Sequence, residues 1–240
     1  MKKIFSEVTD TYELVNHVLT LGLDASWRRK AARLGAADGG LRKKAARAGA
    51  AEAGARCLDV CTGTGEMAGY LSCLGDGTAK VVSVDFSPEM LRRALRKSEA
   101  MRISFALAEA GTLPFPDKTF DLVTISFATR NINTSRENLI DRFREFHRVL
   151  KPGGRFVNLE TSQPRSDFLK KLFHIYIKLL VHPVGRAISG SRAGYFYLSK
   201  TIPAFYGAEE LADTLHEAGF TDVAFQRLSL GIAAIHLAIK

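Results

Sequence analysis

The chain has 240 residues, 46% of them hydrophobic and 25% charged, which excludes wholesale disorder and suits one large α/β domain with appendages. The formal net charge is +9, and residues 28–47 hold eight Lys or Arg side chains against a single Asp. This local basic excess is typical either of a surface that attracts polyanions or anionic membranes, or of a solvated helix face.

The cysteines and the first residues bound the class of protein further. Cys57, Cys61 and Cys73 have neither a zinc-type nor a C-x-x-C spacing, so we expect no metal site and no disulfide framework. Glu7 and Asp10 interrupt the first apolar stretch, so no signal peptide is expected, and no run approaches the roughly 18 apolar residues of a membrane span. We therefore expect a cytoplasmic protein.

Three segments follow one another along the chain. Apolar residues recur at helical spacing over residues 12–34, so residues 1–34 are predicted to form an N-terminal helical cap. Residues 35–54 are rich in Ala, Gly, Lys and Arg and predict a basic insertion or linker. From residue 55 to 240, short apolar strands alternate with helical segments, which is typical of a parallel sheet with crossover helices.

Within residues 55–240 the pattern predicts seven strands. They are expected at residues 56–61, 80–85, 103–107, 120–127, 155–160, 222–230 and 232–239. Helices are expected to begin near Gly65, Pro88 and Thr134 and to cover residues 168–181 and 208–218. Residues 151–154 (KPGG) should form a turn before the fifth strand, because proline cannot continue a helix. The predicted fold is a Rossmann-like α/β sheet of seven mostly parallel strands, with helices on both faces and a C-terminal antiparallel strand.

A glycine loop follows the first predicted strand, at residues 58–66 (LDVCTGTGE). Gly63 and Gly65 let the backbone pass close to a ligand and open a helix whose amides face it. Alone, the loop also satisfies the G-x-G-x-x-(G/A) pattern of dinucleotide-binding folds. Asp59 favours the positively charged amino group of S-adenosylmethionine over a pyrophosphate. Asp85, at the end of the second strand, can accept both ribose hydroxyl hydrogens of either cofactor, or can serve as a helix-cap neighbour.

Several further stretches carry a resemblance to a known family. They are residues 113–121 (LPFPDKTFD), 124–132 (TISFATRNI), 147–154 (HRVLKPGG), 195–198 (YFYL) and 231–236 (GIAAIH). With them the chain from Phe5 to Lys240 resembles the menaquinone/ubiquinone-biosynthesis C-methyltransferases, which are class I S-adenosylmethionine-dependent enzymes. The resemblance implies C-methylation of a polyprenyl quinol ring, of the demethylmenaquinol to menaquinol type.

The resemblance also implies positions for the cofactor, S-adenosylmethionine. Together with the loop residues, the expected contacts are Asp59, Gly63, Thr64, Gly65, Asp85, Phe86, Glu109, Ala110 and Ser126. Three positions depart from the usual letters of the family. Cys61 replaces the first glycine of the Asp-x-Gly-x-Gly-x-Gly form, Glu66 stands where Asp is usual, and Glu109 stands where Asp or Asn is commoner.

For the acceptor, the candidates follow the fourth strand. Arg130 could stabilise a developing phenolate, or form a structural ion pair, and Asn131 could orient that phenolate or a water. Tyr12 is a family-matched candidate for the pocket wall or a packed helix aromatic. His147 and His174 are expected to be packing or surface residues.

Residues 168–186 mix large apolar side chains with lysines, which suits either an anionic bilayer surface or a core-facing helix with a basic edge. We expect a lid at residues 164–206, including Tyr195 and Tyr197, over a lipophilic quinol. Peripheral contact with an anionic membrane surface and self-association into a homo-oligomer both stay open. Three alternatives remain: methylation of another apolar small molecule, a non-catalytic protein of the same fold, and methylation of RNA. Against the last of these, the sequence contains no recognisable RNA-binding domain.

Overall fold

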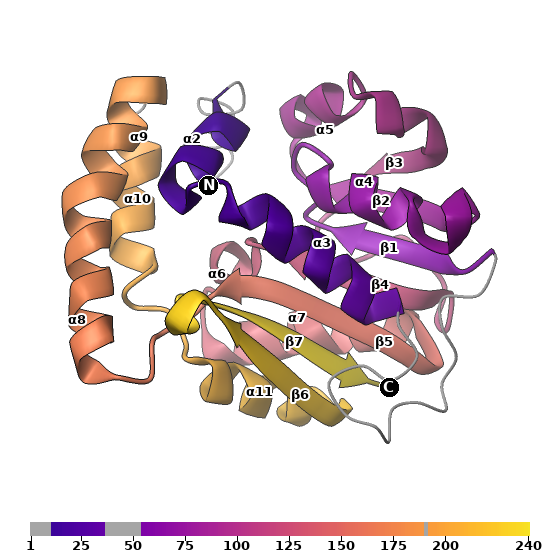
Figure 1. Ribbon diagram of the computed structural model, residues 1–240. Helices are drawn as coiled ribbons and strands as arrows, with labels where there is room; N and C mark the ends of the chain where they lie inside the picture. Colours follow the sequence, from indigo (N-terminus) through magenta and orange to yellow (C-terminus); the bar gives the residue numbers. More distant parts are fainter. Residues whose placement is uncertain (1–10, 37–53, 190–191) are drawn as a thin grey trace.

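A seven-stranded sheet runs through the molecule in the order β3-β2-β1-β4-β5-β7-β6 (Figure 1). The structure is a computed structural model that describes residues 11–36, 54–189 and 192–240. The strands are β1 (Arg56–Val60), β2 (Lys80–Asp85), β3 (Ile103–Leu107), β4 (Phe120–Ser126), β5 (Leu150–Thr161), β6 (Thr221–Leu228) and β7 (Ala233–Ile239). β1 to β5 are parallel, and β7 is antiparallel to both β5 and β6, which confirms the predicted fold class.

The fifth strand begins five residues earlier than predicted. β5 starts at Leu150 and contains residues 151–154, which were expected to form a separate turn. The pairing with β4 is irregular there, since Phe120 lies opposite Leu150 and Leu122 lies opposite Arg155. Two backbone hydrogen bonds join these residues to Lys240. The Gly153 N–H donates to the Lys240 carbonyl, and the Lys240 N–H donates to the Gly154 carbonyl. The turn is therefore a bulge within the sheet, held by a partner that is remote in sequence.

Helices cover both faces of the sheet because successive strand residues point to opposite sides. On one face, α3 (Leu23–Ala36) and α4 (Glu66–Ser72) pack in a buried cluster with Leu122. On the other face, α7 (Arg136–Val149) and α11 (Ala208–Glu217) pack in a cluster with Val123. The remaining short elements are η2 (Leu74–Gly77), α5 (Pro88–Ala94), η3 (Ser98–Arg102), α6 (Thr129–Ile132) and η5 (Ser229–Gly231).

A third cluster joins the N-terminal helix to the segment after β5. It involves α2 (Tyr12–Thr20), α8 (Asp167–Tyr176), the π-helical turn η4 (Ile177–Val181), α9 (His182–Ser189) and α10 (Arg192–Thr201). Val15 packs there against Phe173, Ile177, Val181 and Ile202. In Figure 1 these helices stand together beside the carboxyl end of the sheet. The helix predicted over residues 168–181 is thus continuous through α8 and η4.

Two expectations fall on residues outside this description. Residues 37–53, most of the expected basic linker, lie outside the described residues. The side chains of Tyr12 and Tyr195 are likewise outside it, although their helices are placed. In the part of the chain that is described, no helix has both the length and the apolar character needed to cross a membrane.

Candidate active site

A cavity of about 260 Å³, lined by both charged and apolar side chains, lies at the carboxyl ends of β1, β2 and β4, and we call it the loop cavity. At this edge the strand order reverses on either side of β1, the position where ligands bind in open α/β sheets. Eight of the predicted site residues line it: Gly63, Thr64, Asp85, Phe86, Glu109, Ala110, Ser126 and Asn131. Residues that are far apart in the sequence, such as Gly63 and Ser126, thus line one cavity.

Asp85 fixes the shape of the glycine loop. One carboxylate oxygen accepts the backbone N–H of Gly63 at 2.8 Å, and the other accepts that of Ser87 at 2.9 Å. Burial raises the pKa of Asp85, while these backbone hydrogen bonds act in the opposite direction. The side chain therefore holds the loop in place and also lines the cavity, so the role in positioning the chain and the predicted role toward a ribose are compatible.

Two predicted contacts lie behind the cavity wall. Asp59 is 1% exposed, and its carboxylate accepts hydroxyl hydrogen bonds from Thr62 at 2.6 Å and Thr124 at 2.8 Å. Gly65 precedes α4 with φ +83°, and a Cβ there would lie 3.2 Å from the Cβ of Ala94. Neither residue is among those that line the loop cavity. Asp59 instead holds the hydroxyl of Thr62 in the loop, and Gly65 lies close to Ala94 of α5.

The buried carboxyl of Asp59 should give stability a pH dependence. Burial raises its pKa from 3.8 to about 6, so between pH 4 and 6 the folded chain holds more protons than the unfolded chain. The contribution of Asp59 to stability is therefore fully present below pH 4 and is lost as the pH rises through 6. Asn cannot ionise, so the unfolding free energy of Asp59→Asn minus that of the parent should increase by on the order of 1–3 kcal/mol as the pH rises from 4 to 7. Urea denaturation at pH 4 and pH 7 measures this; a constant difference would contradict it.

The backbone around the loop cavity is strained at two residues other than glycine. Cys61 has φ +54° and Phe127 has φ +55°, both in the left-handed region, and both residues line the cavity. Such conformations cost of order 1 kcal/mol and concentrate at ligand sites. This explains why a glycine is usual at the position of Cys61: the turn after β1 requires a positive φ there.

A second cavity, of about 500 Å³, adjoins the first, and we call it the apolar cavity. Its walls come from α2, α3, α8, η4, α10 and η5, and they include Leu19, Leu172, Phe173, Ile177, Leu198 and Ile202. Three residues, Arg28, Phe127 and Asn131, line both cavities. A cavity with several charged side chains and a mainly apolar cavity therefore share a wall, across which two ligands of different chemistry could meet.

Two of the predicted acceptor residues, Arg130 and Asn131, line the apolar cavity. Arg130 is 6% exposed, and its guanidinium Nη1 donates to Glu160 at 3.2 Å and to Thr161 at 3.0 Å. Asn131 is half-buried, and its Oδ1 has no hydrogen-bond partner within the described part of the chain. Arg130 thus forms the structural ion pair that the sequence analysis gave as one of its two roles. It also lines the apolar cavity. The Asn131 amide oxygen is left available to a ligand.

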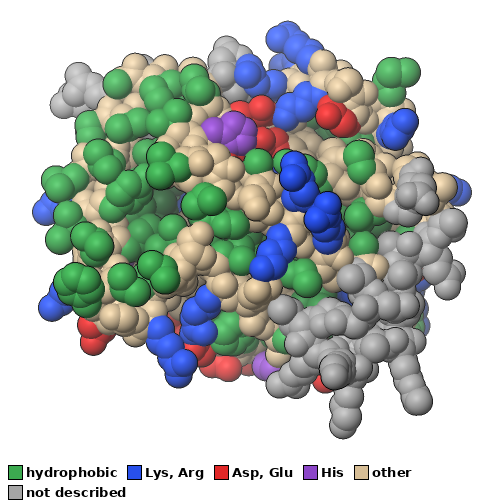
Figure 2. All heavy atoms as spheres, viewed as in Figure 1, with side chains coloured by type: hydrophobic (Ala, Val, Ile, Leu, Met, Phe, Trp, Pro, Cys, Tyr) green, Lys and Arg blue, Asp and Glu red, His purple; other side chains and the backbone are tan. Residues whose placement is uncertain are grey.

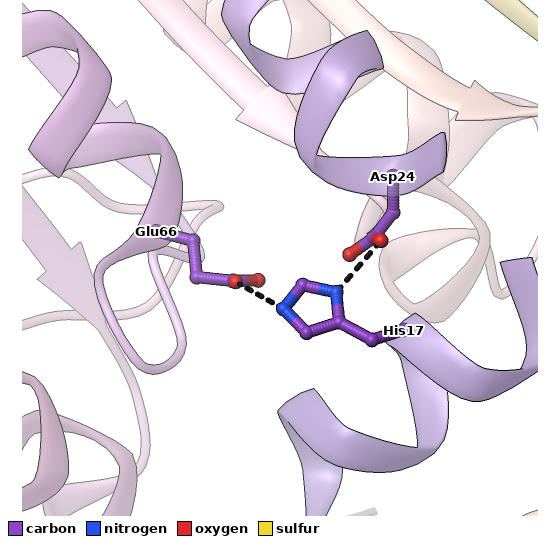
Figure 3. A group of neighbouring side chains, drawn as sticks. All are labelled: His17, Asp24 and Glu66. Atoms are coloured by element: carbon purple, nitrogen blue, oxygen red, sulfur yellow. Dashed lines mark hydrogen bonds and ion pairs between the residues drawn. The ribbon is translucent and has the colours of Figure 1, made fainter. Parts of the chain in front are cut away.

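A cluster of ionisable side chains, which sequence analysis missed, bridges the two cavities. His17 Nδ1 lies 2.7 Å from Asp24 Oδ1, and His17 Nε2 lies 3.6 Å from Glu66 Oε1 (Figure 3). Arg28 donates to Asp24 at 2.6 Å and lies 3.1 Å from Glu66. Arg28 was counted in the basic segment, yet it is 4% exposed and paired. The i,i+4 spacing of Asp24 and Arg28 was the available signal.

Comparisons with known proteins show the family of this chain. The family model described as the ubiE/COQ5 methyltransferase family matches residues 1–240. A demethylmenaquinone methyltransferase from Thermus thermophilus is 38% identical over 236 residues, covering 98% of each chain. A ubiquinone/menaquinone biosynthesis C-methyltransferase from Desulfotalea psychrophila is 35% identical, covering 100% of this chain and 90% of its own length.

Solved structures share the fold at lower identity. A methyltransferase from Thermotoga maritima, described as a possible histamine N-methyltransferase, superposes with a TM-score of 0.66 at 19% identity and full coverage of both chains. Human N-acetylserotonin methyltransferase in complex with S-adenosylmethionine gives a TM-score of 0.61 at 17% identity, covering 95% of this chain and 55% of its own. By the match of its whole length and the identity of its curated relatives, the chain belongs to the ubiE/COQ5 methyltransferase family.

Proposed function

We propose that this protein transfers a methyl group from S-adenosylmethionine to a ring carbon of a polyprenyl quinol, as in the conversion of demethylmenaquinol to menaquinol. The observation that carries the proposal is the shared wall of Arg28, Phe127 and Asn131 between the loop cavity, which has charged side chains in its lining, and the apolar cavity. The relatives' names supply the class of acceptor. The chain would act in menaquinone or ubiquinone biosynthesis.

The residues of the loop cavity fit S-adenosylmethionine. This cofactor is cationic at sulfur and carries an amino and a carboxylate group, and the cavity offers carboxylates (Glu66, Asp85, Glu109) as well as guanidinium groups (Arg28, Arg142). Asp85 would accept from the ribose, and Glu109 with Ala110 would lie at the adenine. Bound S-adenosylmethionine supplies an activated methyl group with its own leaving group, so the protein contributes mainly alignment and exclusion of water.

In the apolar cavity, the ring of the quinol would lie near Asn131 and Arg130 and its tail among the side chains of α8 and η4. The Asn131 amide oxygen would accept a hydroxyl hydrogen from the ring or orient a water. Arg130 would stabilise negative charge on the ring oxygen. Tyr12, on α2, stays a candidate for the wall. We propose that residues 164–206 act as a lid that keeps water from the ring.

The test is an assay of methyl transfer from labelled S-adenosylmethionine. Demethylmenaquinol and demethoxy-type ubiquinol precursors are supplied in reduced form, with the oxidised quinones as matched controls. The expected result is label in the quinol and none in the oxidised quinone, because only the hydroxyl form can push electron density onto the ring carbon. Transfer to an unrelated apolar molecule, or to RNA alone, would contradict the proposal.

We further propose that the rim of the apolar cavity docks on a membrane surface. Figure 2 shows hydrophobic side chains gathered over the side formed by α8, α9 and α10. Five exposed side chains on α8 and η4 belong to this face: Phe168, Leu172, Ile175, Leu179 and Leu180. Lys171 and Lys178, also exposed, lie between them in sequence and would attract anionic headgroups. A lipophilic tail could then pass from the bilayer into the cavity.

Removing an exposed apolar side chain from this rim should weaken membrane binding without unfolding the chain. Leu179 is 62% exposed, so Leu179→Asp should reduce co-sedimentation with anionic liposomes by about 10-fold, since it replaces apolar contact with a repelled charge. Met101→Asp is the matched control, because Met101 is 95% exposed but belongs to η3. Equal retention of the parent and Leu179→Asp at low salt would contradict docking through this face.

A further inference from the structure

Methylation of a ring carbon requires that one proton leave the apolar cavity in each turnover. The new C–CH₃ bond replaces a ring C–H bond, and the donor changes from a cationic sulfonium to a neutral sulfide. The hydroxyl O–H bond breaks and its electron pair stays on oxygen, which raises the electron density at the ring carbon. The ring then loses its C–H proton and regains aromaticity, while the oxygen takes a proton back to restore the hydroxyl, so one proton in total is left over. Some group at this cavity must accept a proton and pass it to solvent.

Asp24 is the sole carboxylate among the described residues that line the apolar cavity, and no histidine lines it. The guanidinium groups of Arg28 and Arg130 are cations and accept no proton. Tyr176 and Tyr197 are phenols whose pKa burial raises, so they stay neutral. Among the described residues, the carboxylate of Asp24 is therefore the one anionic acceptor in the lining of the apolar cavity.

From this geometry we propose that Asp24 accepts the proton of the quinol hydroxyl and that His17 releases a proton to solvent, the two acting as one unit. The inference rests on the proposed function. Asp24 is 1% exposed, whereas the His17 side chain is 40% exposed, and the 2.7 Å hydrogen bond joins them. Figure 3 shows the imidazole between the carboxylates of Asp24 and Glu66. One proton enters at the carboxylate and one leaves at the imidazole, so the pair returns to its starting protonation.

The surroundings keep Asp24 ionised and ready to accept. Burial acts to raise its pKa, but hydrogen bonds from His17, Arg28 and Thr20 outweigh it, so the pKa lies below its usual value. Thr20 donates to Oδ1 at 2.9 Å, and Arg28 donates to Oδ2 at 2.6 Å. The charged groups that contact the pair are Arg28 from α3 and Glu66 from α4, and Arg130, which is paired with Glu160, also lines the apolar cavity.

The same three side chains, His17, Asp24 and Glu66, have ligand atoms close enough to hold a metal ion. Arg28 weighs against that reading, because its guanidinium already lies 2.6 Å from one carboxylate and 3.1 Å from the other. A divalent cation would have to displace a buried guanidinium and leave it without a counter-ion, which is costly. The cluster is therefore better suited to moving a proton than to holding a metal.

Rescue by a small external acid–base pair separates a proton acceptor from a structural residue. In Asp24→Ala, methyl transfer to the quinol should fall by about 100-fold or more, the usual contribution of a general base. Added formate, which fits the space of the lost carboxylate, should restore about 10-fold of that loss, with a pH profile that follows formate. His17→Gln should lower the turnover by about 10-fold, because Asp24 then has no neighbour through which its proton leaves to solvent. Calorimetry should find S-adenosylmethionine affinity within about threefold in both variants.

Glu145→Gln is the matched control, since Glu145 also pairs with an arginine, Arg148, but lines neither cavity. It should keep its turnover with and without formate. If Asp24→Ala does not fold, the turnover of Asp24→Asn is measured instead, beside that of His17→Gln, because Asn keeps the size of Asp but accepts no proton. Turnover of Asp24→Asn within about threefold of the parent overturns the inference. A folded Asp24→Ala that formate does not rescue also overturns it. If the parent itself transfers no methyl group to the quinol, the proposed function fails, irrespective of Asp24.

Discussion

Arg130→Ala is expected to lower the unfolding free energy by about 3–5 kcal/mol and to abolish quinol methylation. Arg130 and Glu160 are 6% and 1% exposed, and Glu160 also accepts the backbone N–H of Arg130 at 3.1 Å. Removing the guanidinium leaves a buried carboxylate without its counter-charge. Loss of turnover in this variant alone would therefore mix a catalytic effect with a structural one.

A double variant resolves the two effects. In Arg130→Gln with Glu160→Gln no buried charge is left uncompensated, so most of the stability should return, whereas methylation should stay low if Arg130 stabilises the ring oxygen. Urea denaturation gives the stability, and the labelled-methyl assay gives the turnover. Arg136→Gln, which removes an exposed pair with Glu217, is the control and should cost less than about 1 kcal/mol. Full activity of the double variant would remove Arg130 from the mechanism.

Asp85→Asn is expected to weaken S-adenosylmethionine binding by about 100-fold. Both oxygens of the carboxylate accept backbone N–H groups, from Gly63 and Ser87, and an amide would set its own NH₂ against one of these donors. The glycine loop would lose a charged hydrogen bond and the ribose an acceptor, each worth about 1.5 kcal/mol or more. Calorimetric titration with S-adenosylmethionine measures the combined loss.

Asp121→Asn provides the matched control for Asp85. Asp121, at the other end of the sheet, also accepts a backbone N–H, that of Arg56 at 2.9 Å, but it lines neither cavity. Its replacement should change cofactor affinity by less than about threefold. Cofactor affinity in Asp85→Asn as high as in Asp121→Asn would show that the loop and ribose do not depend on the carboxylate.

The order and type of the strands were predictable because each strand has a local signal. The bounds of β2 and β3 agree with the prediction to the residue, since runs of alternating or continuous apolar residues end at Asp85 and near Leu107. The start of β5 was not predictable, because residues 151–154 read locally as a turn, and only bonding to Lys240 draws them into the sheet.

The loop cavity could be anticipated for a similar reason: parallel strands end at one edge, so residues after β1, β2 and β4 had to converge. Which of them face the cavity was not visible. Asp59 and Gly65 lie in the loop motif, yet the structure places Asp59 against Thr62 and Thr124, behind the cavity wall.

By itself the sequence determined the α/β fold, the glycine loop and the resemblance to quinol methyltransferases, because these depend on periodicity and on contiguous motifs. Only the tertiary structure decided the role of the N-terminal helices. There α2 and α3 bring His17, Asp24 and Arg28 to Glu66, and α2 closes the apolar cavity against α8 and α10. Arg28 reads as a surface cation in a basic segment. Its burial depends on packing against residues about 40 positions away, which no local pattern records.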